Sequence, residues 1–119
     1  MHILANIIVG IVAVIHVYIL VLEMVLWEQP IGLRTFNMDA DFASATRVMA
    51  ANQGLYNGFL AAGLGWGLLA GADGYTIKVF FLSCVIIAGI FGAATANRRI
   101  LWVQAVPGAV ALWLVCAAA

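Results

Sequence analysis

Charged residues are scarce in this chain: they make up 8% of its 119 residues, whereas hydrophobic residues make up 66%. A soluble globular domain is about one quarter charged, because it needs polar surface to cover its core. The scarcity therefore excludes an ordinary soluble domain. Five basic and five acidic residues cancel, so there is no basic surface for nucleic acid. We predict a single membrane domain over residues 1–119, in contact with the lipid bilayer and with no nucleic-acid partner.

Residues that bind metals or form disulfides are few as well. The two cysteines, Cys84 and Cys116, lie in apolar runs without a partner at metal-ligand spacing. This pattern indicates neither a disulfide framework nor a zinc site, and we expect both to be packing residues. No metal and no cofactor is expected. Haem held by His16 from two copies of the chain is a distant alternative, which a visible spectrum would reveal.

Long apolar runs dominate what remains. A spanning helix needs about 20 mostly apolar residues, and four segments meet that requirement: 3–26, 47–70, 75–96 and 100–117. The first lacks a basic leading region and is longer than the core of a secretory signal, so we expect it to be retained. The predicted fold is an all-α membrane protein, a four-transmembrane-helix bundle.

The basic residues predict an orientation for that bundle. With four spans, Arg34, Arg47, Arg98 and Arg99 share one side of the membrane, and Lys78 belongs to the other. Cytoplasmic loops carry the excess of arginine and lysine. We therefore expect both termini on the extracytoplasmic side.

The segment between the first two spans contains helix-breaking and capping residues. Pro30 and Gly32 end the first apolar run, and Asp39 is a candidate N-cap with Asp41 near the positive end of the helix dipole. We expect the second helix to begin near residue 40 and to cover about 40–70. An irregular loop is the alternative.

Polar side chains in a bilayer are costly and tend to face the interior of a bundle. His16 and Glu23 lie seven residues apart on one face of the first helix, separated by about 10 Å at ~1.5 Å per residue. The polar residues of the second and fourth helices fall at a similar depth, so most polar groups lie in the cytoplasmic half of the predicted bundle. We predict a ligand- and proton-binding site there, with no catalytic residue assigned, formed by His16, Glu23, Asn52, Gln53, Asn57 and Gln104.

Each of these residues also has a structural interpretation. Asparagine and glutamine in membrane helices often bond only to neighbouring helices, Glu23 could extend towards the interface, and His16 could be a satisfied interior histidine. We expect Glu23 to contact the second helix near Asn52 or Gln53.

Small residues recur at four-residue spacing on the second and third helices. Such ladders let a neighbouring helix approach closely. They indicate tight packing within one chain or a homodimer. The ladders are Gly54–Gly58–Ala62, Gly63–Gly67–Gly71 and Ala88–Gly92–Ala96.

One extended pattern resembles a known family. It combines the run 23–27, which is Glu-Met-Val-Leu-Trp, with Pro30, Gly32, Phe36 and the run 51–64, which begins Ala-Asn-Gln-Gly-Leu-Tyr-Asn-Gly-Phe. His16, the Gly-Ala-Ala-Thr run 92–95, Gln104 and Pro107 extend it over nearly the whole chain. Gly108 departs from the alanine expected after the proline. The pattern is similar to the domain of unknown function 1304 family, which implies a four-helix bacterial inner-membrane protein and supplies no activity.

Two functions of different classes fit these residues. In the first, a small ligand is bound or transported, and Glu23 with His16 takes up and releases a proton. In the second, a membrane-embedded isomerase or hydrolase acts on a lipophilic substrate with His16 and Glu23 as an acid–base pair. The sequence favours the binding module narrowly, and it does not decide whether the protein is an enzyme.

Overall fold

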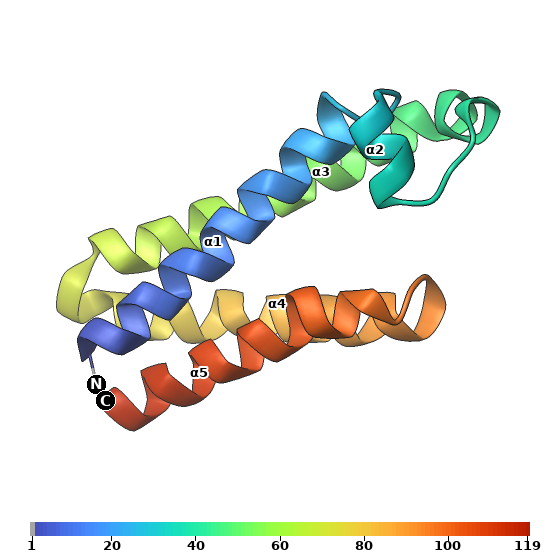
Figure 1. The fold of residues 1–119 in the computed structure, drawn as a ribbon. Coiled ribbons are helices and arrows are strands. Elements are labelled where there is room, and N and C mark those ends of the chain that lie inside the picture. The colour runs from blue at the N-terminus through green and yellow to red at the C-terminus, as the bar shows by residue number, and fades with distance from the viewer. Residues whose placement is uncertain (1) are drawn as a thin grey trace. The chain divides into compact units, whose positions relative to one another are not determined.

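The structure, a computed structural model, describes residues 2–119, and the regular secondary structure of this part of the chain is all helical (Figure 1). A single 3₁₀ turn, η1 (Gly71–Asp73), and a π-helical segment, η2 (Leu101–Ala105), accompany the α-helices. The five α-helices are α1 (His2–Met24), α2 (Pro30–Thr35), α3 (Ala40–Leu69), α4 (Gly74–Thr95) and α5 (Val106–Ala118). The all-α prediction agrees with this architecture.

The predicted number of spans is wrong. Three described helices are long and apolar enough to cross a membrane: His2–Met24, Gly71–Thr95 and Leu101–Ala118. The 30-residue α3 is not among them, because Asn52, Gln53 and Asn57 interrupt its apolar surface. With five α-helices and three candidate spans, the four-transmembrane-helix bundle is not supported. The extracytoplasmic position of both termini required an even number of crossings, so it loses its basis too.

The chain divides into two compact units. The first contains the described residues up to Ile15 together with Leu60–Ala119, and the second contains His16–Phe59. Both α1 and α3 contribute residues to each unit. Because continuous helices run through the division, it does not decide whether residues 1–119 form a single domain, which stays a prediction.

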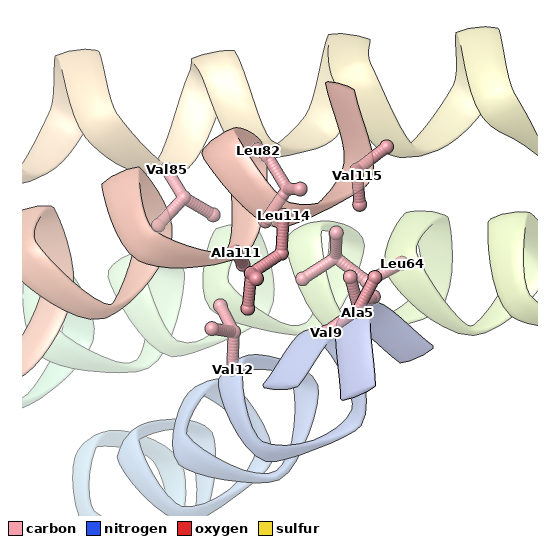
Figure 2. Packing of buried hydrophobic residues seen from close by; sticks show 9 residues of the cluster. All are labelled: Ala5, Val9, Val12, Leu64, Leu82, Val85, Ala111, Leu114 and Val115. Atoms are coloured by element: carbon pink, nitrogen blue, oxygen red, sulfur yellow. The ribbon is translucent and has the colours of Figure 1, made fainter. Parts of the chain in front are cut away.

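The first unit has a core built from small and branched aliphatic side chains (Figure 2). Residues spaced by four and three positions lie on one face of a helix, and this spacing brings one stripe of α1 into the core. Figure 2 shows side chains from α1, α3, α4 and α5 meeting there: Ala5, Val9, Val12, Leu64, Leu82, Val85, Ala111, Leu114 and Val115.

The outer surfaces of the three candidate spans are apolar. Only 17–28% of their most hydrophobic windows is buried within the structure. Large side chains such as Ile3, Val14 and Ile87 are more than 60% exposed. Water would make such surfaces costly, whereas lipid covers them without penalty. The arrangement therefore fits helices that lie in a membrane.

Glycines allow close approach between neighbouring helices in both units. A Cβ atom added at Gly63 would overlap the Phe81 ring, and one at Gly58 would lie 2.8 Å from Leu20 Cδ1. Gly71 has a φ of 62° in the turn between α3 and α4, a backbone conformation that residues other than glycine rarely adopt. Two members of the ladders, Gly58 and Gly63, thus serve packing within the chain, and a homodimer stays a prediction.

The second unit confirms one helix start and adds a helix. The backbone N–H of Phe42 donates to Asp39 Oδ1 at 2.8 Å, so Asp39 caps α3 as predicted. The short helix α2 lies between α1 and α3, where no helix was predicted, and has Pro30 at its first position. A Cβ added at Gly32 would overlap the backbone carbonyl oxygen of Leu26, so α2 packs tightly on the end of the preceding segment.

Candidate functional site

Trp27 joins the segment after α1 to the first turns of α3. Its indole Nε1–H donates to the backbone oxygen of Ala43 and to Thr46 Oγ1, both at 3.1 Å. The Trp27 ring also packs against the ring of Phe36, and the two ring centroids lie 4.9 Å apart. A ring held at both its polar and apolar parts has little freedom, so Trp27 is a fixed wall for whatever lies beside it.

Glu23 lies in the last turn of α1 and reaches α3. Asn57 Nδ2 donates to Glu23 Oε1 at 2.7 Å, and the same amide donates to the backbone oxygen of Gln53 at 3.1 Å. Gly54 makes the approach possible, because a Cβ at that position would lie 2.5 Å from Met24 Cγ. The amide thus binds one carboxylate oxygen and leaves the other available.

A shallow, open cavity of about 230 Å³ lies beside this carboxylate, wholly within the second unit, and Phe42 and Met49 in its lining are more than half exposed. Its walls are mainly aromatic and aliphatic, with one hydroxyl and one amide among them. The lining residues are Glu23, Trp27, Phe42, Thr46, Met49, Ala50 and Gln53. Glu23 is therefore the single charged group in the lining.

No basic side chain neutralises Glu23 within residues 2–119. The one ion pair of this part of the chain joins Arg47 Nη1 to Glu28 Oε1 at 3.6 Å, on exposed surface. A carboxylate in an apolar setting needs a compensating charge or a proton. The geometry can thus accept either a cation or a proton on the same oxygen atoms.

The structure brings some of the predicted site residues together and separates others. Glu23 contacts α3 as expected, although its hydrogen-bond partner is Asn57 and not Asn52 or Gln53. Gln53 lines the cavity, whereas Asn52 is exposed and does not. His16 is completely buried. None of these placements tests a binding role, which stays a prediction.

Gln104 has a local partner in the first unit. Its Nε2 donates to the backbone oxygen of Val85 at 3.3 Å, from η2 to α4. This bond agrees with the structural interpretation of amide side chains in membrane helices. Participation of Gln104 in the Glu23 site stays a prediction.

Sequence reasoning missed most of the apolar lining. Phe42, Thr46, Met49 and Gln53 are spaced by four, three and four positions, which places them on one face of α3. Extending the stripe from Gln53 towards the start of α3 would have found them. Trp27 gave a weaker signal, since interfacial tryptophans are common in membrane proteins.

These features define an all-helical protein that has three helices apolar enough to cross a membrane and a carboxylate-bearing cavity in its second unit. The chain matches the family described as protein of unknown function (DUF1304) over residues 10–116, so it belongs to that family. This confirms the resemblance found in its sequence. An uncharacterized protein, YpaA, of Lactococcus lactis subsp. lactis (strain IL1403) is 29% identical over 106 residues, which cover 87% of this chain and 89% of the relative. No solved structure matches the chain.

Proposed function

We propose that the protein is a multi-pass protein of the bacterial inner membrane that binds a small organic cation at Glu23, in exchange for a proton. One observation carries the proposal: Glu23 is the sole charged residue of an apolar cavity and has an amide, not a basic group, as its hydrogen-bond partner. An anionic group of this kind attracts a positive ligand.

The walls of the cavity favour an organic cation over a metal ion. Trp27 and Phe42 supply aromatic faces and Met49 a polarisable thioether. Metal ions instead require several oxygen, nitrogen or sulfur ligands. A volume of about 230 Å³ is below the ~300–1,000 Å³ of typical ligand pockets, so the ligand is small.

The carboxylate also explains the exchange with a proton. When the cation leaves, a bare carboxylate facing hydrocarbon is costly, and protonation removes its charge. Cation and proton therefore compete for the same group. Transport would additionally need a pathway across the membrane, which a chain of this length would complete as a homodimer.

Calorimetric titration of the detergent-solubilised protein with phenyltrimethylammonium tests the proposal. Glu23→Gln keeps the shape and removes the charge, so we expect the affinity to fall about tenfold or more, equivalent to ~1.4 kcal/mol. The matched control is Glu28→Gln, which removes the same charge from the exposed surface and should change the affinity less than about twofold.

The neutral isostere tert-butylbenzene separates the two classes of function. We expect it to bind weakly and equally to the wild type and to Glu23→Gln. Tighter binding of tert-butylbenzene than of the cation would show a site for uncharged lipophilic molecules, as the enzyme alternative expects. The cation proposal would then be wrong.

A further inference from the structure

A second cavity, of about 250 Å³, lies wholly within the first unit and contains the chain's one lysine. It forms where the beginnings of α1 and α4 meet η1 and the end of α5. The polar groups in its lining are the side chains of His2, Asn6, Tyr75 and Lys78. None of them belongs to the Glu23 site, so a ligand here would be independent of the proposed cation binding.

The ammonium group of Lys78 is held in a defined position. Its Nζ donates to Asn6 Oδ1 at 3.1 Å. The stem lies against α3 at Gly67, where an added Cβ would be 2.6 Å from Lys78 Cγ. A lysine ammonium has three N–H donors, and Asn6 uses one of them. The other two are available to a ligand in the cavity.

The lining around this ammonium contains no acidic side chain. The first unit contains one acidic side chain, Asp73, which is exposed and does not line the cavity. Lys78 makes no ion pair within the part of the chain that the structure describes. Lys78 therefore has an amide, and no acidic side chain, as its partner, and its ammonium gives one wall of the cavity a positively charged group.

The position of the cavity along the helices indicates which anion occupies it. It lies at the first turns of α4, next to the turn that joins α3 to α4, and its mouth is flanked by the ends of two candidate spans. Ends of membrane helices lie at the headgroup level, where lysines extend to the interface and phospholipid phosphates are concentrated.

We propose that this cavity binds the phosphate group of an anionic phospholipid, with Lys78 as the charged contact and Asn6 as the residue that positions it. Tyr75 also lines the cavity, and its hydroxyl is 3.8 Å from Cys116 Sγ. The cavity walls are otherwise small, with alanines at positions 5 and 118, which leaves room for the glycerol end of the lipid.

Native mass spectrometry of the purified protein, titrated with phosphatidylglycerol or phosphatidylcholine, tests this proposal. The wild type should retain one phosphatidylglycerol more tightly than phosphatidylcholine. Lys78→Gln should weaken phosphatidylglycerol binding about fivefold, the effect of one basic residue near a membrane surface. Arg34→Gln removes one positive charge outside the cavity and should leave the binding unchanged.

Two further variants keep the test independent of folding. Lys78→Arg retains the charge and should retain the preference for phosphatidylglycerol. Asn6→Asp places a carboxylate on the existing Lys78 contact without removing the lysine, and it should abolish the preference. If Lys78→Gln and Asn6→Asp both bind phosphatidylglycerol as the wild type does, the proposal is wrong. Displacement of the lipid by inorganic phosphate at comparable concentration would also overturn it, since the ligand would then be soluble phosphate.

Discussion

Asn57 links Glu23 to α3 through one short hydrogen bond of 2.7 Å. In the apolar surroundings of the second unit, the Asn57 amide is the hydrogen-bond donor to the Glu23 carboxylate. The two residues are 34 positions apart in the chain, so the bond also holds α1 against α3. An amide can donate to a carboxylate or accept from a carboxyl group after rotation, and Asn57 therefore suits either charge state of Glu23.

Removal of this bond should cost stability. Asn57→Ala leaves the Glu23 carboxylate without its donor, so we expect the free energy of unfolding to fall by about 1–2 kcal/mol. Asn52→Ala is the matched control, because Asn52 is exposed and has no side-chain hydrogen bond among residues 2–119. Its effect should stay within about 0.5 kcal/mol. Unfolding in mixed micelles, followed by circular dichroism, measures both, and equal effects would contradict the assigned role.

Individual partners could not have been derived from the sequence. The seven-residue spacing of His16 and Glu23 fixes a shared face, but the choice among Asn52, Gln53 and Asn57 depends on the rotation and axial position of α3 relative to α1. Gly54 determines that position, because its lack of a Cβ lets α1 approach at one level. A shift of one helical turn separates the expected partner Gln53 from the observed partner Asn57.

At the scale of elements, the start of the last span departs from regular α-helical geometry. In η2 the hydrogen bonds run five residues back, as in the bond from the N–H of Val106 to the oxygen of Leu101. Pro107 follows at once and has no N–H for the oxygen of Val103. The wider turn brings Ala105 against α4 at Gly89, where an added Cβ would lie 2.7 Å from the Ala105 backbone nitrogen.

Two glycine substitutions test this contact. Gly89→Ala must push η2 away from α4, and we expect the unfolding free energy to fall by about 1–3 kcal/mol. Gly65→Ala is the matched change in α3, where an added Cβ meets nothing within 4 Å. It should stabilise the protein by up to about 1 kcal/mol, because alanine favours the helix. Thermal unfolding in detergent compares them, and a stabilising Gly89→Ala would contradict the packing.

Elements with a strong local signal were predictable, and those without one were not. The capping residue Asp39 predicted the start of α3. The six-residue α2 is too short to show a hydrophobic repeat. The π-helical segment η2 packs Ala105 against Gly89 of α4, and that contact is not visible in the sequence of either segment alone.

At the scale of the whole molecule, the polar residues of α3 account both for the candidate site and for the error in the number of spans. Asn52, Gln53 and Asn57 marked a functional region because they are polar within an apolar setting. The same three side chains lower the hydropathy of α3, so three candidate spans remain in place of four. The composition of the whole chain thus predicts helices in a membrane, but the number of candidate spans depends on the mean hydropathy of each helix within its own bounds.

The central claim is that Glu23 is an exchangeable carboxyl group in an apolar cavity, and carbodiimide labelling tests it most directly. Dicyclohexylcarbodiimide converts a protonated carboxyl in apolar surroundings to a stable N-acylurea, and peptide mass spectrometry locates the adduct. We predict labelling of Glu23 and not of the four exposed acidic residues, Glu28, Asp39, Asp41 and Asp73. Phenyltrimethylammonium should suppress the Glu23 adduct, whereas tert-butylbenzene at the same concentration should not. An unlabelled Glu23 in the folded protein, or labelling that the cation leaves unchanged, would contradict the account.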